Sequence, residues 1–183
     1  MAVRLRMFIA KARDFSTKAR NFAAVLIRSS PLSAFFLLLF LTVFISGFFV
    51  SYRRTERSSM EPTFTVATIL VCTKSANPDD IHHGDCVVAD VSDYEEGLVV
   101  IKRIVGTPGD TLQITDGKLF VNGEEVNDGF PPMEDAGIAA EMVTLGDDEY
   151  FLLGDNRNVS VDSRMFGPVN ARNITNIVIF HIF

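Results

Sequence analysis

The residues of this chain best suited to catalysis are a serine, a lysine and a polar loop, which lie in three separate segments. The serine is Ser59, within the turn-forming run Ser58-Ser59-Met60-Glu61-Pro62-Thr63. A serine hydroxyl is a weak nucleophile until a neighbouring base takes its proton. A catalytic role for Ser59 therefore requires a base from another segment.

The candidate base is Lys102, in the β-branched run 98–105. Side chains alternate along a strand, which places Val100 and Ile104 on the same face as Lys102 and Arg103 on the opposite face. If the first face points into the core, burial disfavours the ammonium form and lowers the pKa of the lysine. If it points to solvent, Lys102 is an ordinary surface charge. This segment alone favours neither interpretation.

The third segment is the polar loop 154–168, with the sequence GDNRNVSVDSRMFGP. It concentrates hydroxyls, carboxylates and guanidiniums directly after an apolar run. Such a loop can orient a catalytic pair, and it can equally be a surface turn held by Asp–Arg pairs. The combination of the three segments, rather than any one of them, indicates an enzyme.

An uncharged apolar run of 17 residues, 34–50, precedes these segments. Extended to 32–52 it gives about 31 Å of helix, which matches the hydrocarbon core of a bilayer. A cleaved secretory signal fits poorly, because the polar stretch before the run is too long and the run itself is longer than usual. The sequence therefore predicts a transmembrane helix over 32–52.

Charge is distributed unevenly around this run. Seven Lys/Arg precede it, against a single acid, whereas three basic residues (Arg53, Arg54 and Arg57) follow it closely. The positive-inside rule then places the N-terminus in the cytoplasm and the body outside. Residues 1–31 mix apolar and basic positions, which suits an amphipathic helix on an anionic membrane surface. The same composition fits a mitochondrial transit peptide.

The body is strongly acidic. From residue 58 onward, seven Lys/Arg stand against 21 Asp/Glu, a balance that excludes nucleic acid as a surface partner. Cys72 and Cys86 are compatible with one disulfide or with two reduced core thiols. Their spacing with His82 and His83 is no zinc pattern, so neither a metal nor a cofactor is expected.

Short β-branched runs separated by turn signals predict an all-β body over 53–183. The expected strands cover 65–73, 85–91, 98–105, 111–115, 118–121, 150–153 and 174–183. An Asp116-Gly117 pair predicts a tight hairpin. With no convincing amphipathic helix, the pattern indicates an antiparallel, barrel-like domain. The segment 127–146 is expected to be a surface excursion with a short helix near 135–142 and no role in chemistry.

Together these segments resemble type I signal peptidases of peptidase family S26. The matching motifs are Ser59-Met-x-Pro-Thr, Gly84-Asp-x-Val-Val, Lys102-Arg-Ile-Val-Gly-x-Pro-Gly-Asp and Gly154-Asp-Asn followed by Ser160-x-Asp-Ser-Arg, in that order. They extend from residue 59 to residue 168, nearly the whole body. With a lysine rather than a histidine at position 102, the chain resembles the bacterial and organellar branch of the family.

The resemblance implies roles for individual residues. Ser59 attacks the scissile carbonyl, Lys102 takes its proton, and Ser160 hydrogen-bonds the lysine nitrogen. The remaining implied residues are Asp162, Arg103 and Arg164, which support the loop as salt-bridged residues, and Met60 and Ile101, which lie near shallow pockets for small side chains.

One departure from the family pattern concerns the oxyanion hole. The oxyanion hole of the family uses the backbone N–H of the nucleophile and, in some members, a serine hydroxyl two residues earlier. Here that earlier residue is Arg57.

The expected activity is removal of signal peptides from exported pre-proteins after a small-x-small motif. The expected location is a bacterial inner membrane, with membrane lipid as a second partner, or alternatively the mitochondrial inner membrane. A dedicated maturation protease of pilins or mitochondrial proteins would use the same residues. An inactive membrane-tethered β-domain remains an alternative, whereas a self-cleaving repressor would require a helix-turn-helix in place of the apolar run.

Overall fold

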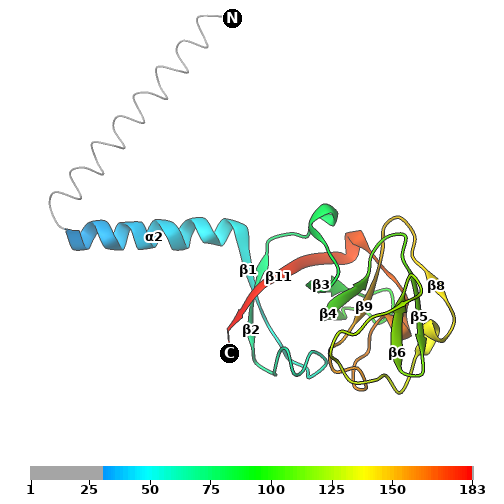
Figure 1. Cartoon of the computed structure of the whole chain (residues 1–183). Coiled ribbons are helices and arrows are strands. Elements are labelled where there is room, and N and C mark those ends of the chain that lie inside the picture. The colour runs from blue at the N-terminus through cyan, green and yellow to red at the C-terminus, as the bar shows by residue number, and fades with distance from the viewer. Residues whose placement is uncertain (1–30, 183) are drawn as a thin grey trace, which may run out of the picture. The chain divides into compact units, whose positions relative to one another are not determined.

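The computed structural model describes residues 31–182 of the 183-residue chain (Figure 1). The basic segment expected at 1–31 lies outside the described residues, apart from its last position. The chain divides into two compact units, Met1–Phe48 and Phe49–Phe183.

Helix α2 spans Pro31–Phe49. Most of the large apolar side chains described on it, including Phe36, Phe40 and Phe44, are exposed. Across the part of the chain that the structure describes, no helix meets the length and hydropathy of a membrane span. The span expected over 32–52 stays a prediction, and its last three residues are in a strand rather than in a helix.

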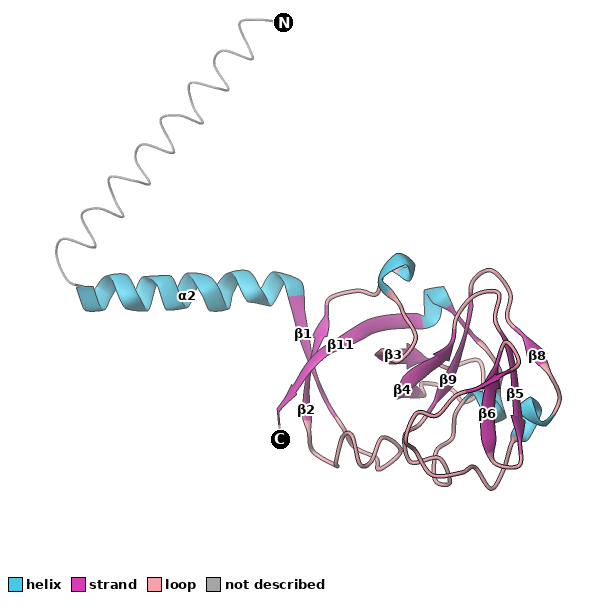
Figure 2. Ribbon diagram, viewed as in Figure 1, coloured by secondary structure: helices cyan, strands magenta, loops and turns pink. Residues whose placement is uncertain are grey.

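The second unit consists of two antiparallel sheets (Figure 2). The larger has the order β1-β2-β11-β3-β4-β9-β10, and the smaller has the order β7-β6-β5-β8. The strands of the larger sheet are β1 (Val50–Arg54), β2 (Ile69–Thr73), β3 (Cys86–Asp90), β4 (Val99–Gly106), β9 (Glu149–Leu153), β10 (Val169–Asn170) and β11 (Ile174–Ile182). Those of the smaller sheet are β5 (Thr111–Thr115), β6 (Lys118–Val121), β7 (Glu124–Glu125) and β8 (Val143–Thr144).

The antiparallel all-β class is confirmed, but the barrel-like closure is wrong. Within the described residues neither sheet pairs its first strand with its last, so both sheets are open. All seven expected strands are present, with shifts at their ends. The Asp-Gly hairpin between β5 and β6 is confirmed, with positive φ angles of 52° at Asp116 and 75° at Gly117. Two positive φ angles are the mark of a type I′ turn, whose twist suits a two-residue hairpin.

Strand β1 was not predicted from the sequence, because the apolar run before it extends into its first residues. Its place in the sheet is fixed partly by Asn176, which is buried in β11. The Asn176 side-chain amide donates to the carbonyl of Thr73, at 2.7 Å, and to the hydroxyl of Ser51, at 3.3 Å. A buried amide needs such partners, and these partners tie β1 and β2 to β11.

Three apolar clusters fill the unit. Strand β3 contributes Val87 and Ala89 to one cluster and Cys86 and Val88 to another, so the two lie on opposite faces of the larger sheet. The third cluster joins Val105, Phe151 and Leu153 to the apolar side chains of β5 and β6. Strand β4 therefore runs through the middle of the core, between β3 and β9.

The remaining elements are short. They are the 3-10 turns η1 (Pro78–Asp80), η2 (Gly137–Ala140) and η3 (Ala171–Asn173) and the one-turn helix α3 (Ser163–Phe166). The helix expected near 135–142 is thus a single 3-10 turn. Cys72 and Cys86 are both buried and free, so the disulfide alternative is not formed.

Candidate active site

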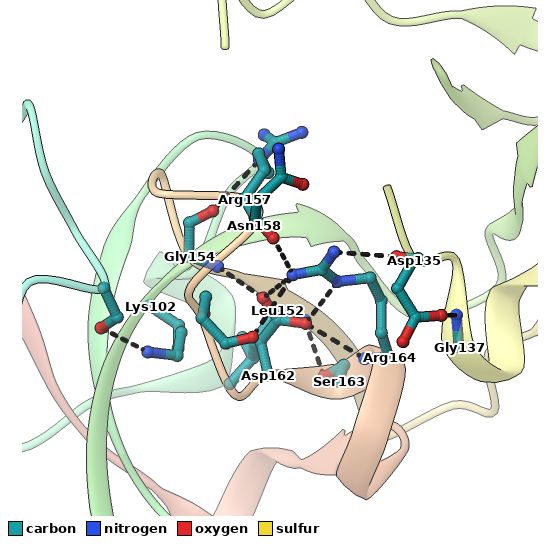
Figure 3. A network of polar contacts seen from close by, with 12 residues as sticks. Lys102, Asp135, Gly137, Leu152, Gly154, Arg157, Asn158, Asp162, Ser163 and Arg164 are labelled. Carbon is teal, nitrogen blue, oxygen red and sulfur yellow. Dashed lines mark hydrogen bonds and ion pairs between the residues drawn. The ribbon is translucent and has the colours of Figure 1, made fainter. Parts of the chain in front are cut away.

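Ser59 and Lys102, 43 positions apart in the sequence, meet in the fold. Lys102 Nζ lies 2.7 Å from Ser59 Oγ, within hydrogen-bond distance, and the line drawn from Lys102 in Figure 3 marks this contact. Ser59 is half-buried and lies in the turn that follows strand β1, four residues after Thr55. Lys102 is only 2% exposed. The two groups that sequence reasoning selected as nucleophile and base are therefore in direct contact.

The burial of Lys102 follows from the period of β4. Val100, Lys102 and Ile104 are buried, whereas Val99 is exposed and Arg103 is half-buried. The first of the two interpretations is thus confirmed: the lysine lies on the core face. Because a charge is disfavoured away from water, burial lowers the pKa of Lys102 from 10.5 to about 8.

Charged neighbours adjust this pKa in both directions. After burial, the largest effect comes from the Asp162 carboxylate, which favours the ammonium form, followed by Arg57, which opposes it. Asp155 likewise favours the ammonium form, and Arg164 opposes it. With a pKa near 8, about one lysine in ten is neutral at pH 7, compared with about one in 3,000 at the ordinary value.

Asp162 is the centre of a dense polar network (Figure 3). Its side chain is fully buried and accepts hydrogen bonds from Arg164 Nε at 2.8 Å and Arg164 Nη2 at 2.9 Å. It also accepts from the backbone N–H of Gly154, at 3.0 Å, and caps helix α3. A carboxylate with this many donors holds the two ends of the loop 154–164 together.

Arg103 has a different partner from the one expected. It donates to Asp155, through Nε at 2.8 Å and through Nη2 at 2.6 Å, and not to Asp162. The alternation of β4 is the reason, since Arg103 lies on the opposite face of the strand from Lys102. Asp155 is fully buried, and sequence reasoning missed its role although it stands in the Gly-Asp-Asn motif.

The hydrogen bond expected between Ser160 and Lys102 is not formed. Ser160 Oγ is buried and has no hydrogen-bond partner among the residues that the structure describes. It packs against Gly154, where an added Cβ would lie 2.2 Å from this oxygen. Burying an unpaired hydroxyl costs free energy, so stability alone does not explain a serine at this position.

Backbone contacts fasten the polar loop to the nucleophile turn. Asn156 N–H donates to the carbonyl of Ser59, at 3.0 Å, and the Asn156 side-chain amide donates to the carbonyl of Ser58, at 3.3 Å. A Cβ at Gly154 would lie 2.6 Å from the Ser59 carbonyl oxygen. Glycine at position 154 therefore allows the loop and the turn to approach each other closely.

The excursion 127–146 contributes more than sequence reasoning assigned to it. Asp128 forms an ion pair with Arg157, whose side chain is 2% exposed. The ring of Phe130 lies between two guanidiniums, 4.9 Å from that of Arg157 and 5.4 Å from that of Arg103. These cation–π contacts link the excursion to the supports of the site. No local sequence pattern predicts these contacts, because Phe130 lies far from Arg103 and Arg157 in the sequence.

An open cavity of about 940 Å³ lies beside Ser59 and Lys102, and its lining includes Met60 and Ile101. Along one side it is bounded by the first half of β4. That strand pairs with β3 over Val99–Arg103 but with β9 only from Arg103 onward. Since Ile104 directs its backbone groups toward β3, alternation directs those of Val99 and Ile101 to the unpaired side.

Comparison with known proteins identifies the family of this chain. The family described as "Signal peptidase, peptidase S26" matches residues 28–183. The chain belongs to this family. Signal peptidase I V of Bacillus subtilis is 34% identical over 145 residues, covering 71% of this chain and 83% of that protein. A probable signal peptidase I-2 of Synechocystis is 35% identical over 137 residues, covering 70% and 61%. A signal peptidase I structure from Enterococcus faecalis aligns with 24% identity and a TM-score of 0.45, over 55% of this chain and 97% of that one.

Lys102→Met should stabilise this signal peptidase family member at low pH. The lysine pKa is lower in the folded state than in the unfolded state, so the unfolded chain binds more protons and wild-type stability rises between about pH 8 and pH 10.5. Below that window the cost of the buried amine is complete, about 3 kcal/mol. We expect the variant to melt higher than wild type at pH 6, with the gap shrinking toward pH 11, as measured by thermal unfolding. A lower melting temperature at every pH would contradict the lowering of the lysine pKa by burial.

Gly154→Ala should separate the polar loop from the nucleophile turn. The new Cβ would overlap the Ser59 carbonyl and the Ser160 side chain, so we expect a loss of stability of about 2 kcal/mol and a large loss of peptidase rate. The matched control is Gly146→Ala, where a Cβ meets only the flexible end of Glu149, at 3.3 Å. Equal melting temperatures and equal rates for the two variants would show that the close approach at residue 154 is not required.

Proposed function

We propose that this chain is a membrane-anchored serine endopeptidase that removes signal peptides from exported pre-proteins. Ser59 is the nucleophile and Lys102 is the general base. The observation that carries the proposal is the 2.7 Å contact between Ser59 Oγ and the buried Nζ of Lys102. Membership of the signal peptidase family supports the same reaction and the same class of substrate.

The chemistry follows from a neutral lysine. Nζ accepts the hydroxyl proton while Ser59 Oγ bonds to the scissile carbonyl carbon. The resulting ammonium then gives this proton to the leaving amine, which releases the mature chain and leaves the signal peptide as an ester on Ser59. Neutral again, Lys102 takes a proton from water, and the hydroxide bonds to the ester carbonyl carbon. As the bond to Ser59 Oγ breaks, the ammonium returns its proton to this oxygen, which frees the signal peptide and restores the hydroxyl.

The oxyanion of each tetrahedral intermediate needs a hydrogen-bond donor. The backbone N–H of Ser59 is suited to this task, because no acceptor among the described residues engages it. Asp162 and Arg164 hold the loop against the turn, and so keep the catalytic pair in place. Ser160, buried beside them without a partner, has a hydroxyl free to contact the lysine nitrogen during the reaction.

Substrate binding uses the unpaired half of β4. An extended peptide can add to Val99 and Ile101 as a further strand, with main-chain hydrogen bonds that do not depend on sequence. Alternate residues of such a strand face the same wall. Met60 and Ile101 line that wall and narrow the space beside it. This favours small substrate side chains at two positions separated by one residue.

The apolar segment 32–52 serves as the anchor, with the N-terminus in the cytoplasm and the body on the outer face of a bacterial inner membrane. The uncharged run 34–50 and the basic residues before it support this placement. Ser59 follows Val50 by nine residues, so it lies within about 30 Å of the membrane face, where membrane-bound substrates present their cleavage sites.

Removal of either catalytic group should abolish processing. We expect no cleavage of a pre-protein by Ser59→Ala or by Lys102→Ala, and a reduced but measurable rate for Ser160→Ala, because the base remains when its orientation is relaxed. The rates are measured with purified full-length protein in detergent. Near-normal cleavage by Ser59→Ala would refute the assignment of the nucleophile.

Protease added to sealed spheroplasts should digest the body of the chain and spare the basic segment before residue 32. The fragments are identified with antibodies against each end, and a cytoplasmic protein serves as the control for sealing. Protection of residues 59–183 would show that the orientation is reversed.

A further inference from the structure

The wall of the catalytic cavity is cationic. Its lining includes Arg53, Arg54, Arg57 and Lys102, against one acidic residue, Glu56. The three arginines lie within six residues of the nucleophile, on the stretch of chain that leads from β1 into the turn. The cavity that holds the reacting groups thus contains far more positive than negative charge.

This charge opposes that of the rest of the body. From residue 58 onward the chain carries a net charge of −14. An acidic peptide is repelled by most of such a surface, and a local group of arginines inside a cavity provides the attractive exception. This contrast in charge gives the cavity a preference for acidic peptides that its shape alone does not provide.

Two of the arginines are free to meet a ligand. Arg53 donates to the side-chain carbonyl of Asn176, at 3.5 Å. The side chains of Arg54 and Arg57 are exposed, and neither guanidinium has a hydrogen-bond or ion-pair partner among the described residues. The charge of Arg57 reaches the reacting centre, because it contributes to lowering the pKa of Lys102.

The position of these arginines selects one part of the substrate. The cavity begins at Ser59 and Lys102 and extends along β4 to Gly97. Three residues of extended chain cover about 10 Å, so a peptide bound beside Val99 places there the residues that lie at least three positions from the scissile bond. Met60 and Ile101, which select small residues upstream of the bond, line this same cavity, so the upstream side of the substrate occupies it.

We propose that Arg54 and Arg57 select pre-proteins with acidic side chains about three to six positions before the cleavage site. This inference rests on the proposed function and adds a substrate preference to it. Both guanidiniums are exposed, so the two ion pairs together should change kcat/KM by about threefold to tenfold, and salt should reduce the effect.

The test uses substrates that differ only in two residues, the fourth and fifth before the scissile bond. These are Asp-Asp, Asn-Asn or Lys-Lys, and a further substrate carries Asp-Asp at the third and fourth positions after the bond. With full-length protein in neutral detergent at low salt, we expect kcat/KM to decrease in the order Asp, Asn, Lys for the upstream pair. The downstream pair should have no comparable effect.

Variants assign this preference to the two arginines. In the double variant Arg54→Gln/Arg57→Gln the Asp-to-Lys ratio of kcat/KM should fall to about one, whereas Arg54→Lys/Arg57→Lys should retain most of it. Arg172→Gln is the matched control, since Arg172 is exposed and does not line the cavity. It should leave the ratio unchanged.

Each contrary outcome has a distinct meaning. If wild type cleaves all the substrates at equal rates, the inference is wrong and the proposed function stands. If the preference persists in the glutamine double variant, other groups are responsible. If that variant keeps the preference in detergent but loses activity in vesicles containing anionic lipid, the arginines bind lipid headgroups instead. If wild type cleaves no substrate, the proposed function fails and the inference fails with it.

Discussion

The constraint on which the rest of the site depends is the burial of one amine beside one hydroxyl. Lys102 must be kept from water so that its pKa falls and its nitrogen can lose a proton, yet two buried carboxylates, Asp155 and Asp162, lie close enough to favour the ammonium form. Each of them is paired with an arginine, Asp155 with Arg103 and Asp162 with Arg164. The pairing weakens their pull on the lysine, and burial then remains the dominant influence. The ion pairs thus serve the reactivity of the amine as well as the stability of the loop.

The fold meets this constraint by placing β4 between β3 and β9, so that one face of the strand enters an apolar cluster. The loop 154–164 then closes over the site, and glycine at position 154 lets it contact the nucleophile turn. Behind the loop, Phe130 and Asp128 hold the guanidinium of Arg157, so even the irregular excursion contributes to the geometry. The stretch of β4 that β9 does not cover is left open, which gives an extended substrate a strand with which to pair.

Much of this could be predicted from the sequence because period-two alternation is a local property. Alternation provided the two alternatives for Lys102, and equally local signals, the β-branched runs and the Asp116-Gly117 pair, predicted the strands and the hairpin. The family motifs correctly indicated the family. What failed depends on tertiary contacts. Arg103 pairs with Asp155 because of the face it occupies, and the Ser160 hydroxyl packs against Gly154 without the expected partner. The sheets are open rather than barrel-like, since strand order depends on pairings between distant residues.

The central claim is that burial lowers the pKa of Lys102 far enough for it to act as a base, and the most direct measurement is the titration of its own resonance. The chain has five lysines, so a spectrum of protein labelled with ¹³C at lysine Cε contains few signals, and comparison with Lys102→Met identifies the one that matters. The account predicts that this signal titrates with a midpoint near pH 8. A midpoint near 10.5, the value of an ordinary lysine, would contradict it.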